Sequence, residues 1–187
     1  MPDRVCSWAS RLISELDDAD RRAESIAAGL SRAQINWQPS PGAWSVGQCL
    51  DHLRMTNEVY LPAIAAALEN RERKVVGELR IGSFSRWFIR NYIAPNPGGT
   101  KARAPKKIAP VQHVEPEILD AFLRSNRATR DLIVRAAEYD VNGIRFRNPF
   151  IPLLRFTVGT GLEIVAKHEG RHLLQAERVR QSAGFPG

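Results

Sequence analysis

The sequence has few of the features that mark secreted, disulfide-rich or membrane proteins. Its two cysteines, Cys6 and Cys49, are too few for a disulfide framework. No apolar run approaches the ~20 residues that a membrane helix needs. The first residues carry charges in place of the apolar stretch of a signal peptide. We therefore expect a cytoplasmic protein without a membrane segment.

Aromatic residues are also scarce, at 7% of the 187 residues, whereas 43% of the chain is apolar and 25% is charged. A chain of this length buries roughly 70% of the surface that its unfolded form exposes. It can therefore build a core without disulfide bonds or an obligatory structural metal. We expect one domain over residues 1–187.

Acidic residues are nearly absent from one segment, and the net charge of +7 is concentrated there. Between Arg71 and Lys107, ten lysines and arginines stand against two glutamates. Aromatic residues lie among them, a pattern that could follow a nucleic-acid backbone. We favour an exposed connection whose aromatic residues pack on the core, and the binding of small anions is a third interpretation. Nucleic acid is thus not the partner that we expect.

Apolar residues recur at three- and four-residue steps in four stretches, which is the period of amphipathic helices. The stretches cover about residues 4–30, 45–70, 115–139 and 157–180. Ser45 and Gln48 form a capping box at the start of the second stretch, and Pro116 suits the first turn of the third. No strand pattern or repeat competes with these helices.

The second and third helical stretches are separated by a long crossover, about residues 71–113, which is crowded with proline and glycine over residues 95–110. Only a short helix near residues 84–92 interrupts it. Four helices with one long connection predict an all-α fold, namely an antiparallel four-helix bundle. Bundles place metal and ligand sites between facing helices.

The chain has four histidines, and three of them could meet in such a bundle. His168 and His172 are four residues apart, so they lie about 40° apart on one helix face. His52 lies at the edge of the apolar stripe of the second helix. If these helices face each other, three imidazoles can share a divalent ion and leave one position open, as in catalytic sites. The alternative is a fortuitous pair and a hydrogen-bonded core histidine.

The residues from His168 to His172 also match H-E-x-x-H, the motif of zinc proteases, with Glu169 as the general base. The context disfavours a protease, because Gln175 and Arg178 stand where the extended motif needs glycine and histidine. A di-iron site would need a second Glu-x-x-His pair, which is missing. Glu169 is nevertheless the candidate catalytic residue beside the metal ligands.

Five further residues near the histidines allow narrower predictions. Gln175 either reaches the open metal position or is solvated. Asp51 could orient a histidine, but adjacent helix positions diverge by about 100°, so we expect it at the surface. Cys49 is either a small buried residue or a fourth ligand that closes the site. Asn57 interrupts an apolar stripe, so it needs a hydrogen-bond partner if it is buried. Trp44 is expected to be a packing residue.

Two motifs together resemble those of the DinB/YfiT-like superfamily. They are Trp37-x-Pro39-x-Pro41-Gly42-x-Trp44-Ser45-Val46-Gly47-Gln48-Cys49-Leu50-Asp51-His52-Leu53 and His168-x-x-x-His172-Leu173-Leu174-Gln175-x-x-Arg178-Val179. The resemblance covers nearly the whole chain. It implies a four-helix bundle, often a homodimer, in which His52, His168 and His172 bind a divalent metal such as zinc or nickel.

Members of this superfamily include metal-dependent transferases and isomerases that use low-molecular-weight thiols such as mycothiol or bacillithiol. The resemblance implies a thiol-dependent S-transferase, or a related transferase or hydrolase, that joins a small thiol to an electrophile. The alternative is a non-catalytic, stress-associated or binding protein whose metal site is structural or vestigial. In the enzyme, Arg86 and Arg90 of the basic segment would hold the acidic part of the thiol.

Overall fold

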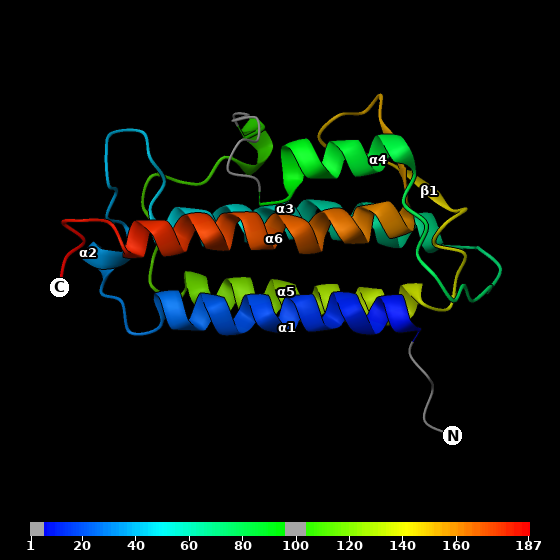
Figure 1. Cartoon of the computed structure of the whole chain (residues 1–187), viewed down its shortest axis with the longest axis horizontal. Helices are drawn as coiled ribbons and strands as arrows, with labels where there is room; N and C mark the ends of the chain where they lie inside the picture. Colours follow the sequence, from blue (N-terminus) through cyan, green and yellow to red (C-terminus); the bar gives the residue numbers. More distant parts are fainter. Residues whose placement is uncertain (1–5, 96–103) are drawn as a thin grey trace, which may run out of the picture.

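A computed structural model describes residues 6–95 and 104–187 of the chain. Four long helices build this described part: α1 (Ser7–Ala27), α3 (Val46–Leu68), α5 (Ile118–Ala136) and α6 (Val158–Arg180) (Figure 1). None of the described helices is long and apolar enough to cross a membrane. Lys101 and Arg103 of the predicted basic segment, and the predicted start of the first helix at residues 4–5, lie outside the described residues.

The predicted all-α bundle with a long crossover is confirmed. In Figure 1, α3 and α6 form one layer and α1 and α5 the other. Each helix also packs on a helix of the opposite layer, α3 on α5 and α1 on α6. The crossover returns the chain to the end of the bundle at which α3 begins, so α3 and α5 run in the same direction. This order places α3 beside α6, the two helices that carry the histidines.

The start of α3 follows the predicted capping box. The Gln48 backbone N–H donates to Ser45 Oγ, and the Ser45 backbone N–H donates to Gln48 Oε1, both at 3.1 Å. At α6, the Thr160 N–H donates to Thr157 Oγ1 at 3.1 Å. These bonds satisfy amide donors that a helix start leaves without intrahelical partners. The predicted start of the third helix at Glu115 is too early, because a turn precedes Ile118.

The described residues of the crossover contain three short elements: α4 (Ser83–Phe88), the π-helical turn η1 (Ile89–Ile93) and the 3-10 turn η2 (Lys106–Ile108). The first two together correspond to the short helix predicted near residues 84–92. Another short helix, α2 (Arg32–Ile35), follows α1 and was not predicted. In Figure 1, α4 lies outside the bundle, against the layer formed by α3 and α6.

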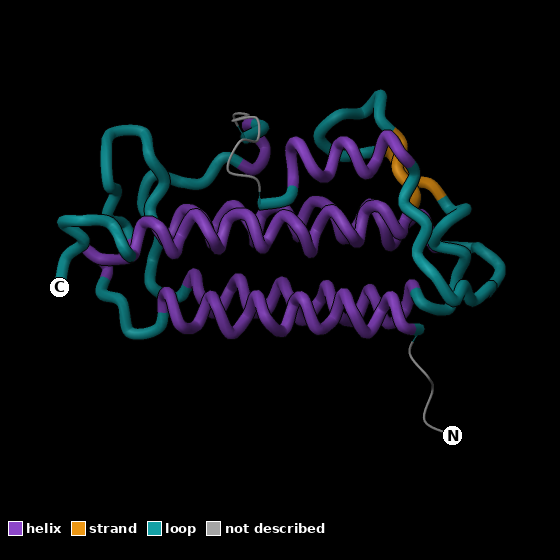
Figure 2. Tube along the Cα trace, in the orientation of Figure 1, coloured by secondary structure: helices purple, strands orange, loops and turns teal. Residues whose placement is uncertain are grey.

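The expectation that the chain lacks strands is wrong in one place. β1 (Arg145–Arg147) and β2 (Arg155–Thr157) form an antiparallel hairpin before α6, drawn in orange in Figure 2. Phe146 and Phe156 are paired across it, and both are buried. Three residues per strand are too few to show an alternating pattern, and packing of the two rings onto the bundle holds the hairpin instead.

The core consists of two apolar clusters that lie one after the other along the bundle. One includes Leu12, Leu16, Ile64, Leu132 and Leu162. The other includes Ile26, Leu50, Leu53, Phe122 and Leu173. Where they meet, each long helix carries polar side chains, among them Asp20, Asn57, Asn126 and Glu169. We call this stretch the polar layer, and the three histidines also lie within it.

Candidate metal centre

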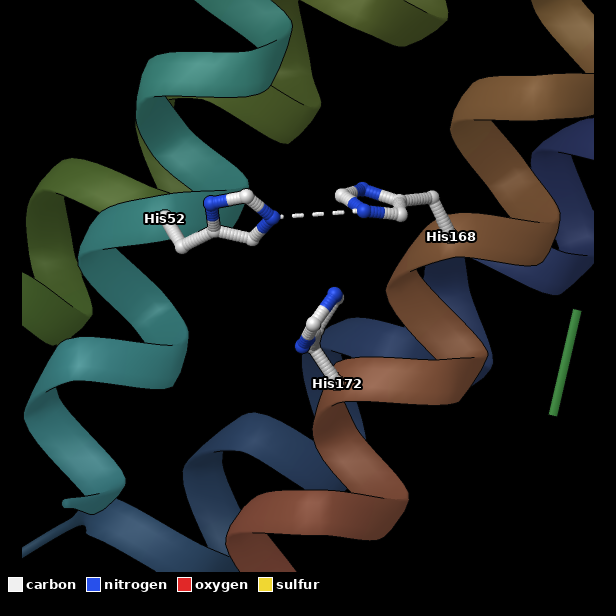
Figure 3. Close-up of side chains that lie close together, drawn as sticks. All are labelled: His52, His168 and His172. Carbon is white, nitrogen blue, oxygen red and sulfur yellow. Dashed lines mark hydrogen bonds between the residues drawn. The ribbon is translucent and has the colours of Figure 1, made fainter. Parts of the chain in front are cut away.

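The structure brings His52, His168 and His172 together between α3 and α6. Their side chains point toward one another, and His168 and His172 project from adjacent turns of α6 (Figure 3). The Nε2 atoms of His52 and His168 are 3.3 Å apart. One nitrogen from each of the three rings lies within 4.8 Å of the other two. The faces expected from sequence to meet therefore do meet.

Hydrogen bonds on the outer side of the rings fix which nitrogen faces the centre. His52 Nδ1 lies 2.7 Å from the carbonyl oxygen of Ile108, and His172 Nδ1 lies 3.0 Å from Gln175 Oε1. An oxygen of this kind accepts, so each Nδ1–H donates and each Nε2 keeps its lone pair for the centre. Gln175 thus orients a histidine, a role different from both that we considered.

The spacing of the donors suits a small divalent cation. Two nitrogens bound at about 2.0–2.1 Å to a tetrahedral ion lie roughly 3.3 Å apart. The separation of 3.3 Å between the Nε2 atoms of His52 and His168 matches this edge. Imidazole nitrogen is also a preferred ligand of zinc and nickel. The residues present therefore fit the metal that the resemblance implies.

Burial keeps the three imidazoles neutral. It lowers the pKa of His52, and it lowers that of His168 well below the usual value, with help from the neighbouring rings and Arg171. The pKa of His172 falls to about 3, again chiefly because the ring is buried. A neutral imidazole can bind a cation without first releasing a proton. At neutral pH the cluster is therefore ready to ligate a metal.

Glu169 lies next to His168 in sequence but on another face of α6. Its carboxylate accepts from Asn57 Nδ2 at 3.2 Å and from Asn126 Nδ2 at 3.0 Å. Successive helical residues point about 100° apart. Because His168 faces α3, the side chain of Glu169 points into the core instead. Burial raises its pKa to about 8. The structure does not bring the predicted base to the histidines.

The prediction that Asp51 lies at the surface is wrong. The residue is only 3% exposed. Its carboxylate accepts from Arg54 Nη2 at 2.7 Å and from the Val111 backbone N–H at 3.3 Å. Asp51 therefore ties the end of the crossover to α3, close to the Ile108 carbonyl that orients His52. The sequence could not predict this contact, because the crossover shows no periodic pattern that would place Val111 beside Asp51.

Three other residues expected near the histidines have the surroundings that the sequence predicted for them. Asn57 is buried and donates to Ser125, Asn126 and Glu169, so it has the partners that its burial requires. Cys49 is buried in the apolar cluster and does not belong to the histidine group, which agrees with a small buried residue. The ring of Trp44 packs against the imidazoles, at centroid distances of 4.8 Å from His52 and 5.4 Å from His172.

The histidines line a cavity of about 560 Å³. Its lining residues come from α3 and the loop before it, from α4, η1 and the segment around η2, and from α6 and the β1–β2 hairpin. The main apolar ones are Trp44, Tyr60, Phe84, Trp87, Phe88, Tyr92, Ile93, Ile108, Phe150, Ile151, Leu154 and Ile164. Sequence reasoning treated the aromatic residues of the crossover as packing residues. The four-residue spacing of Phe84, Phe88 and Tyr92 is the signal that could have revealed a common face.

The arginines predicted to hold a cofactor lie on the elements that border the cavity but do not line it. Arg86 and Arg90 are exposed and are not among the residues that line the cavity. Arg171, which the sequence did not single out, does line it, and its Nη1 donates to the Tyr92 carbonyl at 3.2 Å. His113 is exposed in a loop, away from the histidine group.

Comparison with known proteins agrees with this geometry. The sequence profile of the DinB superfamily matches residues 15–176. The chain belongs to the DinB superfamily. Among solved structures, it is similar to YfiT from Bacillus subtilis, reported as a probable metal-dependent hydrolase with an unusual four-helix bundle topology.

The likeness to YfiT has a TM-score of 0.59 and covers 92% of this chain and 86% of YfiT. At 13% sequence identity, it shows the fold of this DinB-superfamily chain and leaves its activity open. A search of curated proteins found no significant match.

Proposed function

We propose that this chain is a divalent-metal-dependent enzyme, and that it acts as a thiol-dependent S-transferase. One observation carries the proposal: three imidazoles converge beside a cavity, and outer hydrogen bonds direct the lone pairs of His52 and His172 inward. Among the described residues, the group contains no fourth His, Cys, Asp or Glu. Three protein ligands with an open fourth position are typical of catalytic sites, whereas structural sites are closed by four.

The chain's own residues support the site in distinct ways. His52, His168 and His172 would hold zinc or nickel, and Ile108 and Gln175 fix two of the rings. When bound, the ion would act as a Lewis acid and lower the pKa of a thiol or a water molecule. The aromatic lining of the cavity would exclude bulk water from the reacting atoms.

A thiol fits this site better than water does. A free thiol has a pKa near 8.5, so a small shift yields the nucleophile, whereas water must be shifted from 15.7 to about 7. No aspartate or glutamate is among the described lining residues, and Glu169 is held by two asparagines in the core. The site thus lacks a carboxylate base for water. Hydrolysis is the second candidate because of the fold shared with YfiT.

Kinetics can separate these candidates. Zinc- or nickel-loaded protein is mixed with mycothiol or bacillithiol and chlorodinitrobenzene, and absorbance follows the product. A carbon–sulfur bond forms, the carbon–chlorine bond breaks, chloride leaves and the thiol proton passes to solvent. We expect turnover that His168→Ala abolishes and that Gln181→Leu, at the exposed end of α6, retains.

Two other outcomes would assign the chain differently. Cleavage of nitrophenyl acetate without any thiol, combined with no conjugation, would favour the hydrolase. Stoichiometric metal without turnover in either assay would favour the non-catalytic binding protein. Elemental mass spectrometry of each preparation establishes the metal content before the rates are compared.

We also propose that Arg86 and Arg90 contact the acidic part of the thiol. Both are exposed on α4 and η1, the elements whose aromatic residues line the cavity. Reversing both charges to glutamate should raise the KM for the thiol, and unchanged thiol binding would contradict this contact. The expected homodimer and cytoplasmic location are further proposals, which sedimentation and cell fractionation can test.

A further inference from the structure

The cavity gathers half of the aromatic residues of a chain that has few of them. The whole sequence contains fourteen phenylalanines, tryptophans and tyrosines. Seven of them line this one cavity: Trp44, Tyr60, Phe84, Trp87, Phe88, Tyr92 and Phe150. The core of a chain of this length can be filled with aliphatic side chains, and both apolar clusters largely consist of them. The aromatic rings are therefore concentrated where a ligand would lie.

The outer wall of the cavity is preformed. Phe84, Phe88 and Tyr92 follow one another at four-residue steps and stack, with centroids 6.4 Å and 5.4 Å apart. Phe88 also packs on Phe156 of the hairpin at 5.4 Å. Ile89, on the inner side, is 8% exposed and joins the core. A wall fixed in this way can bind a rigid molecule at little ordering cost.

One aromatic residue of the lining contacts the histidines. Trp44 packs directly on His52 and His172. The indole of Trp44 and the two imidazoles line the same cavity as Trp87 and Phe88. The volume of about 560 Å³ is within the range of about 300–1,000 Å³ that is usual for small-molecule sites. A molecule held by the wall can thus extend one end to the open metal position.

The charge of the lining distinguishes between two classes of aromatic-bound ligand. Aromatic cages also bind organic cations. Here, however, the described lining residues include one arginine, Arg171, and no aspartate or glutamate. The metal of the proposed function would add further positive charge. A cationic guest would be repelled, whereas a neutral or anionic ring system would not.

We propose that the substrate of this site is a bulky aromatic molecule without positive charge. Its rings would stack in the part of the cavity that α4, η1 and the β1–β2 hairpin line, with its reactive end toward the histidines. The reaction part of this inference rests on the proposed function. The binding part does not, because the cavity is made by the chain alone.

The test measures binding of N-phenyl-naphthylamine, an uncharged aromatic probe, by fluorescence in zinc-loaded and metal-free protein. We expect saturable binding in both forms. Trp87→Leu should weaken it about three- to tenfold, as expected for loss of one aromatic pair. Trp87 is 46% exposed, so this variant should fold normally. Phe185→Leu is the matched control, because Phe185 packs on Trp37 outside the cavity.

Competition and turnover extend the test to charge and substrate. Naphthol should displace the probe, and naphthyl-trimethylammonium should not. In the thiol-transfer assay, the preference for naphthylmethyl chloride over butyl chloride should fall in Trp87→Leu and persist in Phe185→Leu. Equal displacement by the cation, equal affinity of both variants, or an unchanged preference in Trp87→Leu would each overturn the inference.

Failure of the inference is distinguishable from failure of the proposed function. Zinc uptake without probe binding would overturn the aromatic substrate and leave the metal enzyme intact. Probe binding that Trp87→Leu weakens, in a protein that takes up no metal, would support the aromatic cavity and contradict the metal enzyme.

Discussion

The polar layer of the bundle holds two clusters on different faces of α6, and their polar atoms are used differently. In the histidine cluster, hydrogen bonds from His52 and His172 are made outward, to Ile108 and Gln175, so that the inner nitrogens face one another. The cluster also borders a cavity. In the cluster around Glu169, hydrogen bonds run inward between the members themselves.

The Glu169 cluster links all four long helices. Asn57 of α3 and Asn126 of α5 donate to Glu169 of α6, and Asn126 also donates to Asp20 of α1 at 2.7 Å. Arg130 pairs with Asp20 at the edge of the layer. Among the described residues, no buried side-chain nitrogen or oxygen lacks a hydrogen-bond partner. A buried polar network whose members bond one another across four helices is suited to hold those helices in register.

The comparison teaches how to tell a binding site from a structural network within one layer. Both clusters are buried and both have perturbed pKa values. What differs is whether lone pairs remain directed at a common point beside an opening. The histidines meet this condition and Glu169 does not, although it is adjacent to His168 in sequence.

The largest expected difference between the two clusters concerns metal content. His168→Ala removes one of three ligands and should reduce bound zinc from about one per chain to near zero. Glu169→Gln keeps the size of its side chain and should retain about one zinc per chain. Elemental mass spectrometry of untagged protein measures both. Equal loss in the two variants would make Glu169 part of the site and remove the distinction.

The hydrogen bond to His172 should tune the metal affinity without making the site. Gln175→Leu removes the acceptor for Nδ1–H, which lies at 3.0 Å. Loss of such a partner costs about 10–100-fold in affinity. Competition with a chromogenic chelator measures the change, and Gln181→Leu at the exposed end of α6 is the control. An unchanged affinity in Gln175→Leu would show that this bond does not orient the ring.

The second cluster should be sensitive in stability and insensitive in metal binding. Asn126→Leu removes the donor to Glu169 Oε2 and to Asp20 Oδ1, whereas Asn57 still donates to Glu169 Oε1 and Arg130 still pairs with Asp20. Buried acceptors without a partner cost about 1–3 kcal/mol in the free energy of unfolding. Urea denaturation measures the loss, and Arg127→Ala at the exposed neighbouring position should change it by less than about 0.5 kcal/mol. Bound zinc should stay at the wild-type level.

The pH dependence of stability should have opposite signs in the two clusters. In the metal-free protein, burial lowers the pKa of His168, and that of His172 to about 3, whereas the unfolded chain titrates near 6.5. The unfolded state then binds more protons, so stability falls as pH decreases below about 6.5. The pKa of Glu169 is raised from 4.5 to about 8, so its contribution is lost as pH rises through that interval.

Urea midpoints measured with chelator present at about pH 5, 7 and 8.5 can separate these contributions. Glu169→Gln should remove the decline on the alkaline side, and His172→Asn should reduce the decline on the acid side. A wild-type midpoint that does not change with pH would contradict both assignments.

The sequence was informative wherever one helix determines the outcome. The 3.6-residue period located the long helices, Ser45 and Gln48 marked the start of α3, and the four-residue step placed His168 and His172 on one face. Each of these depends on contacts within about one helical turn. Such signals survive without knowledge of the partner helix.

The sequence did not predict features that depend on contact with a distant segment of the chain. The burial of Asp51 depends on the Val111 amide of the crossover, and the role of Gln175 depends on the ring orientation of His172. The H-E-x-x-H match gave Glu169 a catalytic reading because it does not say which face meets α5. The hairpin strands were missed because Phe146 and Phe156 are held by packing, not by a long alternating pattern.

Because α4 belongs to the crossover, the residues that would recognise a substrate and the residues that would hold the metal lie on different segments. The ligating histidines belong to α3 and α6, whereas the ring-bearing wall of the cavity belongs to a connection that lies outside the bundle. Exchanging α4 and η1 for a segment with other side chains, while Ile108 and Val111 are kept, would reshape the cavity and leave the hydrogen bond that orients His52 in place. One scaffold could in this way accept a series of different guests without redesign of its interior.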